Sequence, residues 1–492
     1  MANFNQSFAS RLNGLIATIA PQYALRREAA LTKRNMLMSS AHYQAAGRGA
    51  RSKDFRVNRT DAVEAVRWDR DRISYIARDM MRNNARVVKG RRQLTNSVVG
   101  AGILPTVKFS DGRGGDNLRK MIEGLIDDHC LTTDFDADGR INMLGQQSVG
   151  FGTIVGDGEV LFRRRFRRQS DGYALNFQVQ VLETDFLNTQ IDGPLANGNY
   201  AHQGIEFNKQ GQRVYYHLFE YHPGSRSGAG LPRSKRISAE NIIHAYDVTR
   251  PGQQRGVSWF APVMTLLHDL QKYQDGQVKR QEIASLFAAV YQTNTESDEL
   301  EQDMGELSAG SILTIGAEEK MDFTNPPSVE GYGDFMKATD RVIAAALGVT
   351  YEGFTGDYSQ VNYTSGRMGR MDTDPGIQNW QRNLMIVQIC AQFGNWIKEA
   401  VQDVADIDPR DYKLEWTPPT RPVVDPTKDY KADAAAVDAG QISRRAVIRR
   451  RGDDPVKVEA EILEERKWER KNSVSFRKST SPAAGSDKGA SK

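Results

Sequence analysis

A long helix, preceded by a run rich in turn residues, is the feature that most constrains the fold of this chain. Residues 251–262 read PGQQRGVSWFAP and lead into an apolar-periodic segment that ends near Phe287. Ser258 is a favourable N-cap, and Pro262 falls in or just beyond the first turn, where a missing N–H is least damaging. The segment predicts a helix of about 30 residues, or roughly 45 Å at 1.5 Å per residue. Such a helix is long for a globular protein.

The spacing of apolar residues indicates how this helix packs. One stripe is apolar and the other faces are polar, which favours packing on neighbours with one side in water. Gly276 lies mid-helix, where glycine costs about 1 kcal/mol relative to alanine and permits bending. An ordinary buried helix of a large domain is the alternative. The apolar stripe comprises Phe260, Val263, Leu267, Leu270 and Val278, and the polar faces carry Gln271, Lys272, Gln274, Gln277 and Lys279.

Composition places the chain among soluble globular proteins. Its 492 residues are 39% hydrophobic and 26% charged, enough for one large core or two to three ordinary ones. No apolar run approaches the roughly 20 residues that span a bilayer, and the N-terminus lacks a signal-peptide pattern. Cys130 and Cys390 are the only cysteines, which fits buried thiols in a reducing compartment. We therefore expect synthesis and assembly in the cytoplasm, without membrane contact.

Positive charge is concentrated locally, although the formal net charge is only +4. Each cluster can contact phosphate, with a solvated face or inter-subunit ion pairs as the alternative. The clusters are Arg26–Arg27, Lys89–Arg92, Arg163–Arg168, Arg444–Arg451 and the tail after Lys471.

The first half of the chain alternates between helical and strand patterns. Residues 1–55 predict a partly helical arm. Helical spacing begins at Asp61 and reaches Met80, with an end or bend at Arg82–Asn84 and a second helix after it. Short strand-like runs separated by Gly, Asp and Pro then predict a β-rich unit over residues 150–248.

The second half begins with a small insert between two helices. Strand character appears at residues 288–293 and 311–315, with an acidic stretch between them, and a shorter helix returns over about residues 328–347. A helix over 378–401 reads as core, and further helices are predicted over 428–439 and 455–470. The final stretch, rich in Ser, Ala, Gly and Lys, predicts disorder.

Residues 348–376 predict a glycine-rich, polar loop. Repeated glycine permits positive φ and mobility. Its side chains supply hydrogen-bond donors without concentrated charge, and an ordinary surface loop is the alternative. The donors are Gln360, Asn362, Tyr363, Thr364, Arg367 and Arg370.

Motifs of common enzyme classes are absent from the sequence. There is no phosphate-binding G-x-x-x-x-G-K-[ST] loop, no H-E-x-x-H, no G-x-S-x-G and no Rossmann fingerprint. The Gly156–Glu159 run, GDGE, reads as a turn, because two acids give too few metal ligands. We expect no catalytic residue, no metal site and no cofactor.

Four blocks in a fixed order carry a resemblance to a known family. Residues 251–262 and the following Leu267, Leu270, Tyr273 and Asp275 resemble the motif and stem helix of portal proteins of lambda-like tailed phages. Similar blocks occur at 82–103, at 156–163, and at 356–367 with 424–428. The resemblance covers roughly residues 60–465. Gly276 departs from it, since alanine is more usual there.

The resemblance implies a mixed α+β portal fold, with a wing, a long-helix stem, a small α/β clip and a helical crown, assembled as a ring. Beyond the arm at 1–55, its parts fall at 56–250 (wing), 251–287 (stem helix), 288–327 (clip), 328–347 (returning stem helix), 348–376 (tunnel loop), 377–425 (wing or core helix and strand), 426–470 (crown) and 471–492 (disordered basic tail).

The same resemblance implies a function. A ring of twelve copies at one capsid vertex passes duplex viral DNA without sequence specificity, docks the terminase large subunit and then head–tail joining or adaptor proteins, and meets the major capsid and scaffold proteins. The chain would be found in the virion, and in host cytoplasm during assembly. A DNA-binding minor capsid or packaging protein that forms no ring is the alternative.

Two sets of functional residues follow from this implied architecture. The channel set adds stem residues to the polar side chains of the tunnel loop, and the clip set would face protein partners because carboxylates repel phosphate. The added stem residues are Lys272, Lys279, Arg280, Lys337 and Arg341, and the clip residues are Glu296, Asp298, Glu299, Glu301, Asp303 and Glu306.

Overall fold

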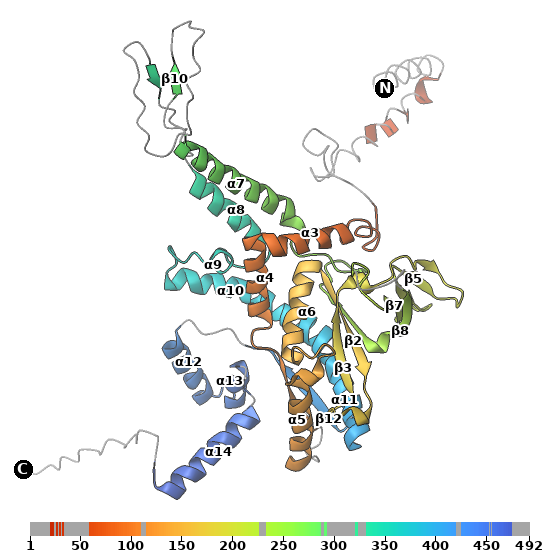
Figure 1. Cartoon of the computed structure of the whole chain (residues 1–492), viewed down its shortest axis with the longest axis vertical. Coiled ribbons are helices and arrows are strands. Elements are labelled where there is room, and N and C mark those ends of the chain that lie inside the picture. The colour runs from red at the N-terminus through yellow and green to blue at the C-terminus, as the bar shows by residue number, and fades with distance from the viewer. Residues whose placement is uncertain are drawn as a thin grey trace, which may run out of the picture. The chain divides into compact units, whose positions relative to one another are not determined.

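The computed structural model of this chain is a mixture of helices and small antiparallel sheets (Figure 1). It describes residues 20–23, 26–27, 29–30, 32–33, 59–109, 115–225, 233–286, 290–292, 320–322, 331–419, 425–451, 453 and 455–474. Contacts divide the chain into two units, Met1–Asp61 and Ala62–Lys492. In the first unit, the described residues between 21 and 33 are helical.

Four helices form the beginning of the second unit. They are α3 (Arg70–Asn83), α4 (Ala85–Val98), α5 (Asp116–Cys130) and α6 (Met143–Asp157). Asn84 separates the first two, because its backbone is extended while its side chain accepts hydrogen bonds from the N–H groups of Arg86 and Val87. The predicted bend at Arg82–Asn84 is therefore present. The preceding helix begins later than expected, since residues 62–69 form turns.

Two sheets follow, in the region where the sequence predicts strands. A three-stranded sheet has the order β3–β2–β9 and a five-stranded sheet the order β4–β5–β6–β7–β8, with antiparallel neighbours throughout. The strands are β2 (Glu159–Phe166), β3 (Phe177–Leu182), β4 (Gly193–Pro194), β5 (Tyr200–His202), β6 (Ile205–Phe207), β7 (Arg213–Phe219), β8 (Ser234–Ser238) and β9 (Ile242–Tyr246). Short 3-10 helices lie between these elements: η2 (Thr133–Phe135), η3 (Gln169–Asp171), η4 (Thr184–Phe186) and η5 (Ala239–Asn241).

The long helix is shorter than the sequence predicts. A 3-10 turn, η6 (Ala261–Val263), leads into α7 (Met264–Leu286), which is α-helical through Gly276. Four members of the predicted apolar stripe are buried, but Val278 is 65% exposed, so the stripe does not extend along the whole helix. The returning helix α8 (Tyr332–Ala346) contacts α7, with Tyr273 and Tyr332 stacked at 5.7 Å between ring centroids (Figure 1).

Between α7 and α8, the described residues form one small antiparallel pair. Strand β10 (Val290–Gln292) pairs with β11 (Lys320–Asp322). The first lies within the predicted strand at 288–293. The predicted strand at 311–315 and the acidic stretch before it lie outside the described residues.

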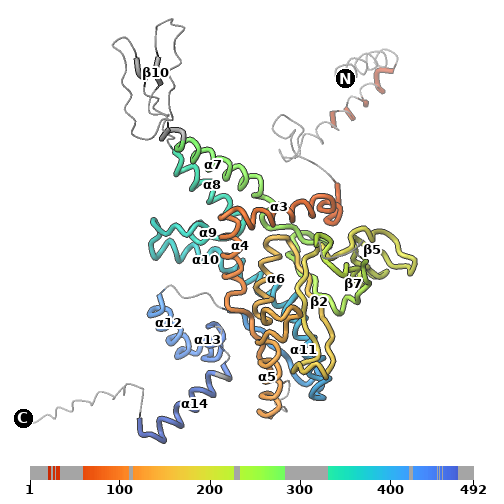
Figure 2. The backbone as a smooth tube through the Cα atoms, viewed as in Figure 1, coloured from red at the N-terminus to blue at the C-terminus, as the bar shows by residue number. Residues whose placement is uncertain are grey.

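The segment 348–376 is mainly helical, which corrects the prediction of a glycine-rich loop. It contains α9 (Tyr351–Thr355) and most of α10 (Tyr363–Asn379), with non-helical chain only at 348–350 and 356–362. Figure 2 traces this path from α8 through α9 into α10. The predicted core helix continues α10 as a π-helix, η7 (Trp380–Cys390), and then α11 (Ala391–Ala405).

The remaining described elements close and extend the unit. Strand β1 (Leu104–Phe109) pairs along its length with β12 (Tyr412–Thr417). Three helices follow, α12 (Pro426–Asp438), α13 (Arg444–Arg450) and α14 (Pro455–Asn472).

The core forms around the three-stranded sheet. Phe393 of α11 meets Phe135 and Phe162, each at 5.3 Å between ring centroids. Gly150 lets α6 approach the same sheet, because a Cβ there would lie 2.3 Å from the ring of Phe162. A second, smaller cluster joins Leu161 and Leu182 to the five-stranded sheet. These two clusters hold the body from which α7 and α8 emerge.

Candidate functional site

A buried ion cluster lies where two of the sequence blocks meet. The carboxylate of Glu159, at the start of β2, accepts hydrogen bonds from the Arg255 guanidinium at 2.6–3.1 Å and from the Gly256 N–H at 2.7 Å. Arg70 of α3 donates to it at 2.7 Å, and His244 of β9 lies 3.0 Å away. Glu159 is fully buried and Arg255 only 1% exposed. Thus Arg255 of the PGQQRG run anchors the entry to α7.

The charges in this cluster compensate one another. Burial alone raises the pKa of a carboxyl, but Arg255 and Arg70 outweigh that effect and hold the pKa of Glu159 well below its usual range. Burial lowers the pKa of His244 to about 4, against the opposing effect of Glu159. His244 is therefore neutral near pH 7 and donates a hydrogen bond to the carboxylate.

Gly158 makes this approach possible. It ends α6 with φ +98°, and a Cβ there would lie 2.3–2.6 Å from backbone atoms of Val257. The sequence predicted a turn at Gly156–Glu159, and the structure places a helix end there. The block thus joins α6 and β2 to the chain that enters α7.

A second set of contacts, which we call the stem-base contacts, holds α7 and α8 to α4. Arg86 donates to Asp340 of α8 at 2.6 Å and to Gln274 of α7 at 2.8 Å. Asn84 donates to Gln271 of α7 at 3.0 Å. Asp340 is buried and Arg86 is partly buried. These bonds set where the two helices leave the body.

The stem residues predicted from sequence sit along α7 and α8. Lys272, Lys279 and Arg341 are exposed, whereas Arg280 and Lys337 are half-buried. The Arg341 guanidinium lies 5.4 Å from the ring centroid of Tyr351, a cation–π contact between α8 and α9. The structure therefore distributes these cations along two adjacent helices without gathering them into one pocket.

The α9–α10 turn is fixed by local hydrogen bonds. Gly356 ends α9 with φ +80°. Asp357 accepts from the Ser359 N–H and hydroxyl at 3.1 and 2.6 Å and from the Tyr351 hydroxyl at 3.2 Å. Asn362 caps α10, accepting from the Ser365 N–H at 2.8 Å. The polar side chains are thus presented by a capped helix and a tight turn.

Most of the predicted tunnel residues are exposed. The side chains of Gln360, Thr364 and Arg367 are exposed and Arg370 is half-buried. Tyr363 is 42% exposed, with the ammonium of Lys428 5.0 Å from its ring centroid. Asn362 is exposed too, although its side-chain oxygen serves as the helix cap. The predicted clip acids, Glu296, Asp298, Glu299, Glu301, Asp303 and Glu306, all lie outside the described residues.

The basic cluster at Arg163–Arg168 is only partly a surface feature. Arg164 pairs with Glu399 and lies 5.6 Å from the ring centroid of Trp396. Burial and the neighbouring Arg165 lower the pKa of Arg163. Arg91, from the cluster on α4, donates to the Gly152 carbonyl at 3.1 Å. Several of these arginines therefore stabilise the fold.

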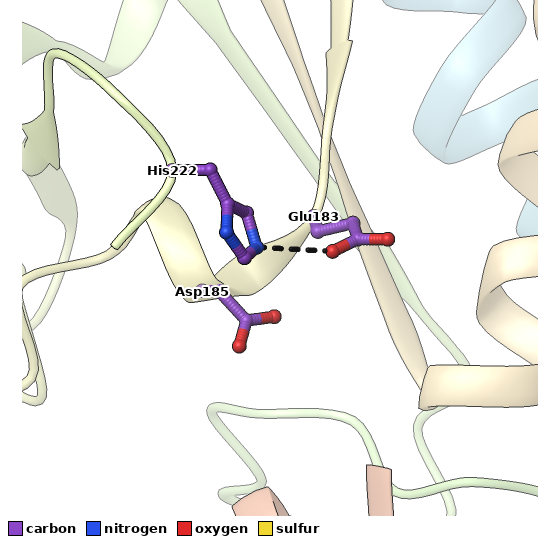
Figure 3. Close-up of side chains that lie close together, drawn as sticks. All are labelled: Glu183, Asp185 and His222. Atoms are coloured by element: carbon purple, nitrogen blue, oxygen red, sulfur yellow. Dashed lines mark hydrogen bonds and ion pairs between the residues drawn. The ribbon is translucent and has the colours of Figure 1, made fainter. Parts of the chain in front are cut away.

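One group of side chains in the described part of the chain has metal-ligand composition. Glu183, Asp185 and His222 approach one another, and Figure 3 shows the 3.2 Å contact between His222 and Glu183. Arg78 already pairs with Asp185 at 2.5 Å and with Glu183 at 3.3 Å. It also binds Asp157 at 2.6 Å. The geometry is that of an ion-pair network centred on Arg78.

Sequence reasoning missed the buried ion cluster, although two of its members, Glu159 and Arg255, lie in the blocks that carried the resemblance. The motifs predict no ion pair for these two residues, and Arg70 and His244 lie outside the four blocks. The available signal was a charge flanked by residues with backbone constraints, as in Gly158–Glu159 and Arg255–Gly256. Among the described helices, none is long and apolar enough to cross a membrane.

Comparison with known proteins gives consistent matches. The family model described as "Phage portal protein, lambda family" matches residues 48–381. A "Probable portal protein" of Halomonas phage phiHAP-1 is 27% identical over 433 residues, covering 83% of each chain. "Portal protein B" of Escherichia phage lambda is 21% identical over 386 residues, covering 69% of this chain and 71% of the relative.

Solved structures show weaker likeness. The neck of a native gene transfer agent particle aligns with a TM-score of 0.46 at 13% identity, covering 79% of this chain and 94% of the other. An HK97 family phage portal protein from Corynebacterium diphtheriae aligns with a TM-score of 0.32 at 10% identity, covering 73% and 97%.

Proposed function

This chain belongs to the lambda family of phage portal proteins, and from that membership we propose that its copies form a ring of twelve at one capsid vertex. Duplex viral DNA passes through the ring during packaging and ejection. The observation that carries this proposal is the family match over residues 48–381, which spans both helices of the stem and the α9–α10 segment. A head-to-tail interface repeated around an axis closes into such a ring.

In this proposal the ring also binds other proteins. It docks the terminase large subunit during packaging and head–tail joining or adaptor proteins afterwards, and it contacts major capsid and scaffold proteins. The acids at 296–306 serve the protein contacts. The ring resides in the virion and assembles in host cytoplasm. The chain takes no cofactor and carries out no catalytic step.

DNA contact falls to the α9–α10 segment and the stem cations. Gln360, Thr364 and Arg367 are exposed at the beginning of α10 and in the turn before it. They offer mainly neutral hydrogen-bond donors. Contacts of this kind are sequence-blind and weak, so a duplex can slide past them, whereas many phosphate clamps would hold it.

The ring is tested by native mass spectrometry of the purified chain together with negative-stain images. The expected result is assemblies of about twelve copies with an open centre. A monomer that binds DNA tightly and in a salt-sensitive manner would instead support the DNA-binding packaging protein that forms no ring.

The DNA contact is tested by replacing three exposed side chains together, Gln360→Ala, Thr364→Ala and Arg367→Ala. Rings should assemble as in the unchanged protein, while the DNA protected from nuclease inside filled heads should fall. Arg140→Ala, an exposed arginine of the body, is the matched control. Loss of assembly in the triple variant would show that the segment is structural and would remove the proposed DNA role.

A further inference from the structure

The three C-terminal helices bury almost nothing of their own. Among the described residues of 425–474, only Val447 and Pro455 are buried, and α12 contains no buried residue. Short helices gain most of their stability from packing an apolar face, and helices shorter than about 12–15 residues are marginal alone. Helices α12, α13 and α14 have 13, 7 and 18 residues. This region therefore needs a covering surface from outside itself.

One face of α14 is acidic and open to solvent. Glu461, Glu464, Glu465 and Trp468 occupy positions i, i+3, i+4 and i+7, so they share one side of the helix. All four are exposed, Trp468 by 52%. The three glutamates form no hydrogen bond or ion pair with any described residue of the chain. We call these four residues the acidic face.

The opposite side of α14 already has its partner. Glu459 lies about 160° around the helix from Glu461 and accepts from Arg445 of α13 at 2.7–3.2 Å. That pairing lowers the pKa of Glu459. Since α13 of the same chain is held against this side, it does not cover the acidic face.

Helix α13 and its end carry the complementary charge. Residues 444–451 contain five arginines and no acid. Arg450 and Arg451 lie 3.7 Å from Asp433 of α12, and Arg445 pairs with Glu459. Arg444 and Arg449 form no hydrogen bond or ion pair within the described residues, and Arg444 senses Glu459 only at longer range. Arg444 is exposed and Arg449 is half-buried, so each retains a positive charge that an external carboxylate can neutralise.

We propose that the acidic face of one copy docks on Arg444 and Arg449 of α13 in the next copy around the ring. The two halves of this contact lie on different helices of one chain, so the contact is head-to-tail and repeats. DNA does not fit the acidic face, because carboxylates and phosphates repel. The inference rests on the proposed ring and assigns one of its subunit interfaces.

Charge reversal followed by mixing tests the contact. The variant R444E/R449E and the variant E461K/E464K should each fail to form rings, because like charges then face one another. An equimolar mixture should recover ring assembly, since alternating copies place glutamate against lysine and arginine against glutamate. A ring of twelve permits strict alternation. Arg410→Glu with Lys209→Glu, both exposed in the body, is the control and should leave assembly unchanged.

Each outcome decides something different. Rings formed by either variant alone, or no recovery in the mixture, overturn the contact while leaving the ring in place. If the unchanged protein forms no ring, the proposed function falls and this contact with it. Circular dichroism of each variant establishes that its helices form.

A cross-link gives an independent reading. Both native cysteines are buried, so the pair R444C/E464C introduces two thiols at exposed positions. Oxidation of assembled protein should give a ladder of multimers under denaturing electrophoresis. If all the oxidised protein runs as monomer, the two positions do not meet between neighbouring copies, and the proposal is overturned.

Discussion

Glu159 shows how a single carboxylate can determine the path of the chain at a domain junction. It is fully buried, and it joins β2 to α3 through Arg70 and to the entry of α7 through Arg255 and the Gly256 N–H. A buried charge of this kind costs several kcal/mol to desolvate unless its partners are all present. Removing one partner should therefore lower the free energy of unfolding, because the desolvation cost is no longer offset.

We predict that Arg255→Ala destabilises the body by about 3–5 kcal/mol, the usual cost of leaving a buried charge without its partner. Urea unfolding followed by circular dichroism measures the change. Arg140→Ala, which removes an exposed arginine without a side-chain contact in the described structure, should change stability little. Equal effects of the two substitutions would mean that Arg255 adds no more than an ordinary surface cation.

We predict that two buried histidines make the folded protein less stable in weak acid. The pKa of His244 is lowered to about 4, and burial also lowers the pKa of His129 to about 4. Because the unfolded chain binds these protons below about pH 6.5 and the folded chain does not, stability falls as pH drops from 6.5 towards 4. Each histidine contributes a slope of about 1.4 kcal/mol per pH unit. Glu159, with a depressed pKa, adds its loss only below its ordinary value.

The measurement is the melting temperature between pH 7 and 5, a range in which most carboxylates remain ionised. His244→Gln should reduce the decline, and adding His129→Gln should reduce it further. A decline that is unchanged in the double variant would assign the acid sensitivity to other groups.

At the scale of elements, helices and strands with clear periodicity could be predicted, and those governed by special contacts could not. The bend at Asn84, the strands between 159 and 246 and the helices at the C-terminus follow from apolar spacing and cap residues. Four residues of the α7 stripe pack as expected, but Val278 is 65% exposed, because apolar spacing does not reveal where the neighbouring body ends.

The prediction of a loop over the α9–α10 segment was wrong for a physical reason. Gly353, Gly366, Gly369 and Gly376, with Pro375, favour a loop, since each glycine costs a helix about 1 kcal/mol. The capping box of Asn362 and Ser365 and the contact of Gly369 with Thr350 favour a helix. A Cβ at Gly369 would lie 3.2 Å from Thr350, so close packing accounts for a glycine that reads as flexible in sequence.

Only the exposed part of the candidate site could be predicted from the sequence. The exposed donors on α10 and the stem cations could be named from their polarity and position. The buried ion cluster could not, because the partners Arg70, Glu159, His244 and Arg255 are far apart in sequence and meet only after the sheets form.

We predict that Arg86→Ala loosens the helices of the stem without unfolding the body. The substitution removes the bonds to Asp340 and Gln274 and leaves a buried carboxylate without its partner. Hydrogen exchange should become faster at residues 264–286 and 332–346 and stay unchanged in β2 and β3. Arg82→Ala, in the same sequence block but exposed and weakly paired at 3.6 Å, is the control. Equal protection in both variants would assign the stem's position to apolar packing.

For the whole molecule, the proposed ring predicts how salt acts on DNA retention. Neutral glutamine at Lys272, Lys279 and Arg341 should preserve rings, while DNA association falls and becomes less salt-dependent, because fewer counterions are released. Electrophoretic mobility shifts over a salt series measure the slope. An unchanged slope would mean that these cations face away from the DNA.

The pairing of β1 with β12 gives the order in which a newly made chain can fold. Leu104 pairs with Thr417 and Phe109 pairs with Tyr412. A strand from the first quarter of the chain therefore cannot pair until a strand from the last fifth has been made. During synthesis at about 5–20 residues per second, β1 keeps an unpaired edge until most of the chain has left the ribosome. Nascent copies made side by side on one message thus expose the same edge at once, and the late arrival of β12 limits how early any copy is ready to assemble.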